Sequence, residues 1–207
     1  MFTKIGALLM ADGNSRRAGE KDLLFPVEGE PMIRHCVRGI LDSGIDDIVV
    51  VLGHDRWRIA AALSGLPVCM VVNAGSKEKK DAESIRIGIS AIPKYVTGVL
   101  MERCGYPLVM QETYRILDRH HDMHPGRILL PVRNGRGGYP ILFPEPLCRP
   151  ATAEMPLSRL VKKYRDHVSR IEVDDPGVYY NGDSEPVNRR RITIGALYRR
   201  PSSPVSH

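Results

Sequence analysis

A glycine-rich loop near the N-terminus holds the residue types best suited to binding phosphate. The apolar run Ile5–Met10 leads into a polar segment in which Gly13 and Gly19 enclose Arg17. Glycine lets the backbone approach phosphate oxygens and direct several N–H groups at them, and arginine adds a bidentate donor. A glycine-containing loop after a strand is also common in proteins where it only forms a turn and binds no ligand. By itself, therefore, this pattern is compatible with a phosphate-binding loop and with a purely structural turn.

Four other groups of polar residues could do chemistry, but a structural explanation is favoured for each. They are His54, the set His120, His121 and His124, the pair Asp174 and Asp175, and Cys104. The three clustered histidines have metal-like spacing, but no acid or cysteine obviously completes the set, so a solvated helix end is favoured. The two aspartates precede Pro-Gly and are expected to cap a turn. A local hydrogen bond is expected for the strand-end histidine, and a buried packing role for the cysteine.

Strands are expected to alternate with helices as far as residue 133. The predicted strands are Ile5–Met10, Asp47–Leu52, Pro67–Val72, Val96–Met101 and Ile128–Val132, and the predicted helices are Met32–Leu41, Trp57–Leu63, Ala82–Ile92 and Gln111–His121. Further on, the pattern predicts a turn over 134–138, strands Tyr139–Phe143 and Ile171–Val173, and a helix Pro156–Asp166. This alternation is typical of an α/β fold with three layers, α/β/α, and a mainly parallel sheet.

The composition fits a globular domain outside the membrane. The chain has 207 residues, of which 43% are hydrophobic and 26% charged, as is usual for globular proteins. No apolar run approaches the roughly 20 residues of a membrane span, and the short N-terminal apolar stretch lacks the features of a signal peptide. Four cysteines lie far apart with no C-x-x-C pair. This usage disfavours a disulfide scaffold and favours a cytoplasmic location.

The net charge of +6 comes mainly from the C-terminal end of the chain. Five arginines and no acid follow Glu185, so all but one of the net positive charges lie in this stretch. We therefore expect a single domain over 1–188 and a basic, flexible tail over 189–207. With aromatic residues at 6% and no basic face on the folded part, nucleic acid is not an expected partner.

Many residues of the first 54 recur in a known pattern. The matching positions are Gly13, Ser15, Arg17, Gly19, Leu23, Leu24, Pro26, Gly29, Pro31 and Met32, followed by the strand Val49–Leu52 with Gly53 and His54. In these positions the chain resembles the MobA-like nucleotidyltransferases, in particular the molybdenum cofactor cytidylyltransferases. Weaker matches extend the resemblance over roughly residues 4–185 and are Asn73, Ser84–Ile89, Pro107–Val109, Pro131, Val132 and Gly138–Pro140.

The resemblance implies a Rossmann-like fold of the nucleotide-diphospho-sugar transferase type. It also implies binding of CTP or another NTP with Mg²⁺, and transfer of the nucleotide to a molybdopterin phosphate with release of pyrophosphate. By family analogy the nucleotide-binding residues are Ala11, Gly13, Asn14, Ser15, Gly19, Asn73, Ser84 and Arg86. The same analogy makes Arg17 and Lys21 catalytic, Asp183 a metal ligand, and Gly138, Tyr139 and Pro140 the acceptor side.

Several departures from the family pattern fall on residues that carry its chemistry. The loop lysine of the family aligns with Asp22, with Lys21 one place earlier, and the magnesium-binding carboxylate after the fourth long strand aligns with Gly105. Two unit charges about 4 Å apart interact by roughly 4 kcal/mol at an effective dielectric constant near 20. A carboxylate in place of a phosphate-binding cation is therefore expected to weaken nucleotide binding strongly.

Three functional hypotheses follow from these observations. In the first, the loop is re-registered, Lys21 reaches the phosphates, Asp12 or Asp183 helps to hold the metal, and the protein is a transferase. In the second, the fold is kept without catalysis, and the protein binds a cofactor or a partner during maturation of a molybdoenzyme. The third, a dinucleotide-dependent oxidoreductase, is disfavoured because no Gly-x-Gly-x-x-Gly motif with a downstream acid is present.

Overall fold

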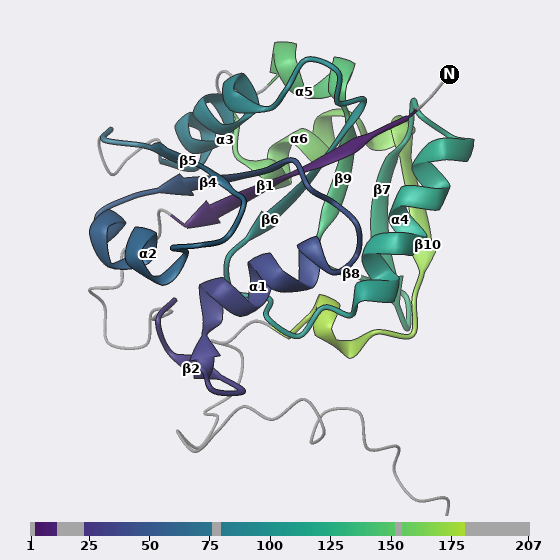
Figure 1. The fold of residues 1–207 in the computed structure, drawn as a ribbon. Helices are drawn as coiled ribbons and strands as arrows, with labels where there is room; N and C mark the ends of the chain where they lie inside the picture. Colours follow the sequence, from purple (N-terminus) through teal and green to yellow (C-terminus); the bar gives the residue numbers. More distant parts are fainter. Residues whose placement is uncertain (1–2, 12–22, 76–79, 152–154, 181–207) are drawn as a thin grey trace, which may run out of the picture.

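A computed structural model describes residues 3–11, 23–75, 80–151 and 155–180 (Figure 1). Its strands are β1 (Ile5–Ala11), β2 (Pro26–Val27), β3 (Glu30–Pro31), β4 (Ile48–Leu52), β5 (Cys69–Val72), β6 (Gly98–Arg103), β7 (Ile128–Arg133), β8 (Arg136–Gly137), β9 (Ile141–Pro144) and β10 (Val168–Glu172). Its helices are α1 (Met32–Leu41), α2 (Arg56–Ala62), α3 (Lys80–Ala91), α4 (Gln111–Met123), α5 (Glu145–Ala151) and α6 (Leu157–Lys163). Two short 3₁₀ helices, η1 (Arg165–His167) and η2 (Pro176–Val178), flank β10.

The main sheet has the order β10-β7-β9-β6-β1-β4-β5, with β8 paired to β7. The strand β1 lies in the middle and pairs in parallel with both β4 and β6, and β5 extends this parallel half. The strand β9 runs antiparallel to β6 and β7, while β10 is parallel to β7. The sheet is therefore mainly parallel, and the ends of β1, β4, β5 and β6 meet at one edge, called here the carboxyl edge.

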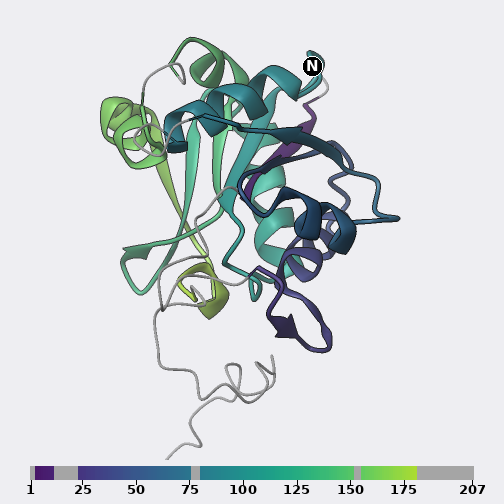
Figure 2. The same cartoon turned by 90° about the vertical axis from the view of Figure 1, so that its left-hand side faces the viewer.

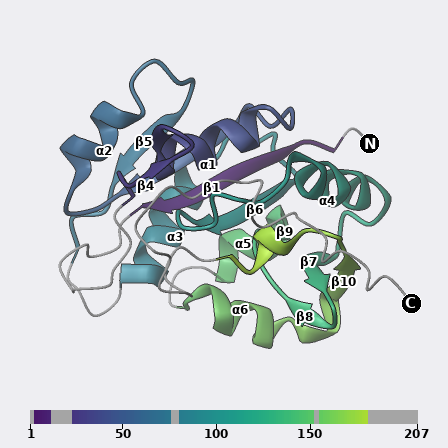
Figure 3. The ribbon, with the colours of Figure 1, turned by 90° about the horizontal axis from the view of Figure 1, so that it is seen from below.

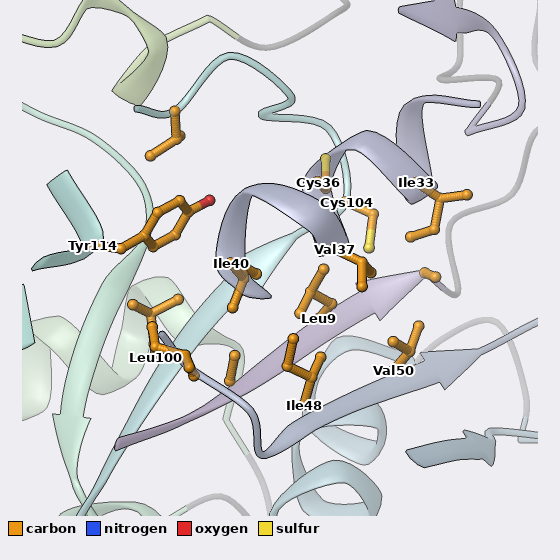
Figure 4. Close-up of a cluster of buried hydrophobic side chains, with 14 of the residues drawn as sticks. Leu9, Ile33, Cys36, Val37, Ile40, Ile48, Val50, Leu100, Cys104 and Tyr114 are labelled. Carbon is orange, nitrogen blue, oxygen red and sulfur yellow. The ribbon is translucent and has the colours of Figure 1, made fainter. Parts of the chain in front are cut away.

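Helices cover both faces of this sheet, as Figure 2 and Figure 3 show. One face packs against α1, α2 and α4, and its apolar cluster includes Leu9, Ile40 and Leu100 (Figure 4). The other face packs against α3, α5 and α6, with Leu8 and Ile85 in its cluster. Neighbouring residues of β1 thus enter opposite clusters, because side chains alternate across a strand. The predicted three-layer α/β/α fold is confirmed.

The N-terminal half follows the sequence pattern closely, whereas the C-terminal half departs from it. The helix α1 has the predicted bounds. The predicted turn over 134–138 contains the strand β8, and β10 begins three residues before the predicted strand Ile171–Val173. The helix α5 and the β2–β3 hairpin were not predicted, because prolines in both segments hide their periodicity. None of the helices in the described ranges has the length and apolar character needed to cross a lipid bilayer.

Side-chain bonds tie together the opposite edge of the sheet, called here the amino edge. Lys4 forms an ion pair with Asp47 at 2.9 Å, and the Tyr95 hydroxyl donates to the same carboxylate at 2.6 Å. These contacts lower the pKa of Asp47 against the opposing effect of its partial burial. Nearby, Thr97 Oγ1 lies 3.1 Å from His121 Nε2, at the end of α4.

Candidate functional site

The carboxyl edge brings together the ends of four parallel strands. Ala11, at the end of β1, pairs with Leu52 at the end of β4, and the amide of Cys104, just after β6, donates to the carbonyl of Met10. Ala11 is buried at this edge. Ligands of open α/β sheets bind in the crevice outside the carboxyl ends of such strands. This edge is therefore the candidate site.

Asn73 and Ser84 meet directly at this edge. The Asn73 amide nitrogen Nδ2 donates to Ser84 Oγ at 2.7 Å, and Asn73 Oδ1 accepts from the amide of Gly75 at 2.9 Å. Its backbone N–H donates to the carbonyl of Leu52. Both side chains are buried. The pair thus links the end of β5 to the first turns of α3.

The helix α3 also presents a carboxylate that the sequence analysis did not single out. A Cβ placed on Gly75 would lie 1.9 Å from Glu83 Oε2 and 3.0 Å from Asn73 Oδ1. The Glu83 carboxylate therefore packs directly over the backbone at Gly75, and a larger residue there would require the Glu83 side chain to move. Arg86, three residues further along α3, is exposed.

The turn after β6 has a glycine, Gly105, at the position where the resemblance implies a metal-binding carboxylate. Gly105 occupies that position and is buried, as is Cys104, in agreement with the packing role expected for Cys104. One residue before the end of β6, Glu102 is buried and accepts a hydrogen bond from the Tyr114 hydroxyl at 3.1 Å. Burial and the nearby Glu102 carboxylate raise the pKa of Tyr114 well above its ordinary value, which keeps this phenol protonated.

Two tyrosines connect this turn to the predicted acceptor segment. The rings of Tyr106 and Tyr139 have centroids 4.8 Å apart and are tilted by 37°. Burial, with smaller effects from Tyr139 and Glu102, raises the pKa of Tyr106 to about 12. The Tyr106 phenol is therefore uncharged at neutral pH. The structure thus brings Tyr139 to the end of β6.

The segment Gly138–Pro140 is positioned by the backbone around η2. The amide of Tyr139 donates to the Val178 carbonyl at 2.9 Å, and a Cβ on Gly138 would lie 2.4 Å from that same oxygen. Only glycine fits this close approach, and the Tyr139–Pro140 peptide is cis. Asp175 holds η2 in place, because its carboxylate accepts from the amides of Met110 and Gly177 and from the Thr113 hydroxyl.

Several predicted site residues lie outside the described residues. They are Asp12, Gly13, Asn14, Ser15, Arg17, Gly19, Lys21, Asp22 and Asp183. Within the described ranges, no three His, Cys, Asp or Glu side chains are grouped so that they could hold a metal ion.

Two polar side chains that the sequence analysis did not expect to be buried, His121 and Glu102, are buried in the structure. His121 is completely buried, so the solvated helix end expected from the sequence is wrong for this residue; its ring packs over Gly98, where a Cβ would lie 2.7 Å from Nε2. Glu102 could have been noticed as an acid that directly follows the apolar run Gly98–Met101 within the same strand. Asp175 caps η2 through Gly177, as the Pro-Gly sequence predicted.

Solved structures share the fold over most of the chain. The structure of Rv0371c from Mycobacterium tuberculosis H37Rv aligns with a TM-score of 0.72 at 24% identity, covering 88% of this chain and 94% of that one. A nucleotidyl transferase from Methanothermobacter thermautotroptrophicus aligns with a TM-score of 0.70 at 21% identity, covering 84% and 88%. At these identities the likeness concerns the fold.

Sequence comparison agrees with the fold. A 2-C-methyl-D-erythritol 4-phosphate cytidylyltransferase from Nocardia farcinica is 37% identical over 91 residues, which are 42% of this chain and 38% of that protein. A bifunctional protein GlmU from Mycolicibacterium paratuberculosis is 29% identical over 126 residues, or 58% and 25%. The matches thus span less than two fifths of these relatives. The MobA-like NTP transferase domain matches residues 7–171, and the chain therefore belongs to this nucleotidyltransferase family.

Proposed function

We propose that this protein transfers CMP from CTP to the phosphate of a molybdopterin acceptor. A phosphate oxygen of the acceptor forms a bond to the α-phosphorus of CTP, the bond from that phosphorus to the β-phosphate oxygen breaks, and pyrophosphate leaves. The observation that carries the proposal is the family domain over residues 7–171. The cytidylyltransferase from Nocardia farcinica supports CTP as the nucleotide.

The proposed nucleotide half combines a backbone cradle with cationic side chains. Amides of residues 13–19 would bind the triphosphate, and Arg17 and Lys21 would neutralise its charge. Asn73 and Ser84 support this half by fixing the start of α3 against the end of β5. Asp183 would hold Mg²⁺, whose contribution is Lewis-acid stabilisation of the phosphate charge.

The proposed acceptor half is the segment Gly138–Pro140 with Tyr106. A pterin is a planar ring system, and the rings of Tyr106 and Tyr139 offer flat aromatic faces against which it could pack. Because burial raises the pKa of Tyr106 to about 12, this phenol carries no negative charge that would repel the acceptor phosphate. The Tyr139 ring is fixed relative to β6 by its contact with Tyr106 at 4.8 Å.

Calorimetric titration with CTP, GTP and ATP, each with and without Mg²⁺, tests this proposal. We expect micromolar binding of CTP that depends on Mg²⁺ and weaker binding of the other two nucleotides. Failure of all three nucleotides to bind would overturn the proposed transferase.

The substitution Asp22→Lys tests the alignment of the loop. Replacing a carboxylate by a cation beside the triphosphate is expected to strengthen CTP binding at least tenfold. The variant Asp46→Lys, which makes the same charge change at the amino edge, serves as the control for net charge. Equal affinities of the two variants would mean that residue 22 does not face the phosphates.

A second candidate is a non-catalytic protein that binds the cofactor or a partner during maturation of a molybdoenzyme. It is favoured by Gly105, which stands where the family has a metal-binding carboxylate. Uptake of a pterin or a molybdoenzyme without any nucleotide binding would support it. A cytoplasmic location goes with either candidate, since Cys36, Cys69, Cys104 and Cys148 form no disulfide among the described residues, as is usual in a reducing compartment.

A further inference from the structure

The strand β5 is the outermost strand of the parallel half of the sheet. The sheet order ends at β5, which among the described strands pairs only with β4. The amide of Asn73, just after β5, donates to the carbonyl of Leu52 in β4. Because neighbouring residues of a strand turn their N–H and C=O groups to opposite sides, those of Met70 and Val72 point away from β4. The outer side of β5 therefore presents backbone donors and acceptors that bond to no described strand.

The side chains at this end of the sheet are apolar and exposed. Met70 is 41% exposed and Val72 is 45% exposed. They pair in register with Val50 and Leu52, so they lie on the sheet face that α1 and α2 cover. The helix α2 lies at the same end of the molecule as β5 (Figure 1 and Figure 3) and carries Trp57, which is 77% exposed. Open backbone groups beside exposed apolar side chains are the features of a strand that adds another strand.

The segment around β5 has no charged residue. Proteins usually protect an outer strand with lysine or another charge, or with proline inside the strand. Here no charge occurs between Arg58 and Lys77, and Pro67 lies before β5 rather than in it. In a two-fold symmetric antiparallel pair, a charge in this segment would lie near the same charge on the second copy and destabilise the pair. An uncharged segment is therefore suited to pairing with itself.

From these features we infer that β5 pairs with β5 of a second copy of this chain, antiparallel about a two-fold axis at Val71. In this register Met70 of each copy lies opposite Val72 of the other, and both pairs exchange their outward N–H and C=O groups. A register centred on Met70 would instead pair Val72 with Val68, whose N–H already donates to the carbonyl of Leu66 at 2.9 Å. The axis at Val71 therefore makes fullest use of the open groups, and the sheets of the two copies become continuous.

Sedimentation velocity of the full chain at increasing concentration tests this inference. A pair of four-residue strands is a small interface, so the dimer is expected to be weak, with a micromolar Kd. A chain that stays monomeric at every concentration would overturn the inference, including the case in which β5 pairs with an extended segment of another protein. The pairing uses none of the side chains proposed to bind nucleotide, so failure of nucleotide binding would leave the inference standing.

The substitution Met70→Pro tests the location of the interface. Because the Met70 N–H points away from β4, proline removes a bond of the dimer but none of the ladder within the chain. The variant is expected to weaken the dimer at least tenfold, and circular dichroism should show a folded chain. Met70→Val, which keeps the N–H and an apolar side chain, is the matched control and should still dimerise. A dimer of unchanged affinity in a folded Met70→Pro variant would overturn the inference.

Disulfide formation between copies tests the register without relying on the proline variant. At the axis, the two Val71 residues form a pair without mutual hydrogen bonds, with Cα atoms about 4.5 Å apart, which a disulfide can span. With Cys69→Ser as background and the other three cysteines buried, Val71→Cys is expected to form a disulfide dimer in oxidised glutathione. Val72→Cys is the matched control, because its Cα atoms would lie roughly 8 Å apart, and it should react at least tenfold more slowly. Equal rates, or no disulfide dimer of Val71→Cys, would overturn the inference.

Discussion

The two edges of the sheet are stabilised in different ways. At the carboxyl edge, buried polar side chains form hydrogen bonds that join distant segments, as Asn73 does with Ser84 and Asp175 with Thr113. At the amino edge, Lys4, Asp47 and Tyr95 form a network in which Lys4 and Tyr95 are exposed. Water can replace exposed contacts but not buried ones, so the carboxyl edge depends more on each residue.

The difference fits the role of each edge. A ligand site needs backbone held in place while its surface stays open, and buried side-chain bonds behind the surface achieve this. At the amino edge, Lys4 and Tyr95 contact Asp47 from the solvent side, and only the contact between Thr97 and the buried His121 resembles the carboxyl edge among the contacts of the described residues. Four substitutions or conditions test this comparison, given from the largest expected effect to the smallest.

Asp175→Ala is expected to lower the free energy of unfolding by about 3 kcal/mol, because buried donors on Met110, Thr113 and Gly177 lose their acceptor. Urea denaturation measures the change. Asp174→Ala is the matched control, since the neighbouring aspartate is 87% exposed in its ion pair with Arg133, and its loss should cost under about 0.5 kcal/mol. Similar losses for both variants would contradict the assigned role of Asp175.

Asn73→Ala and Ser84→Ala are each expected to cost about 1–2 kcal/mol, because each leaves a buried partner at the carboxyl edge. The double variant should cost little more than the larger single loss, giving a coupling energy of about 1 kcal/mol. Denaturant titration of all four proteins completes the cycle. Fully additive losses would show that the two side chains do not support each other.

Acidification is expected to destabilise the protein through His121. Burial lowers the pKa of His121 below its ordinary value of 6.5, so the unfolded chain takes up a proton at a higher pH than the folded chain. Stability is then fully present above pH 6.5 and falls as the pH drops towards the folded pKa, by up to about 1.4 kcal/mol per pH unit.

Unfolding free energies between pH 5 and 8 measure this slope for the protein and for His121→Gln. The variant should have a flatter profile, whereas His124→Gln, at an exposed position, should keep the original slope. An unchanged profile in His121→Gln would assign the acid sensitivity to other groups.

Tyr95→Phe is expected to have the smallest effect, because it removes one exposed hydrogen bond from a carboxylate that keeps its ion pair with Lys4. The thermal midpoint should change by less than in any variant of the carboxyl edge. Thermal midpoints measured at low and high salt would show whether the ion pair between Lys4 and Asp47 offsets the lost hydrogen bond. A loss as large as that of Asp175→Ala would remove the distinction between the two edges.

Much of the fold could be predicted because its signals are local. The apolar run at β1 and the helical spacing at α1 place both elements within one residue of their predicted bounds. The strand β10 begins three residues before its predicted start, because only Ile171 of its five residues is buried. The apolar pattern of the first three residues was too weak to predict a strand there. The two-residue strands β2, β3 and β8 depend on their pairing partners and leave no periodicity in the sequence.

The candidate site was predicted less completely than the fold. Asn73 and Ser84 were expected to contact nucleotide, and the structure adds that they bond to each other. No local pattern indicated that Tyr106 contacts Tyr139, because the two residues are far apart along the chain. The proposed domain boundary at residue 188 remains a prediction.

Local patterns of apolar residues and glycines therefore determined the order of strands and helices along the chain and the three layers of the fold. Tertiary packing alone decided which polar groups are buried together, such as His121 over Gly98 and Asp175 beneath the start of α4. The physical reason is that periodicity depends on neighbours a few residues apart. Burial and hydrogen-bond partners depend instead on segments that meet only when the sheet is assembled.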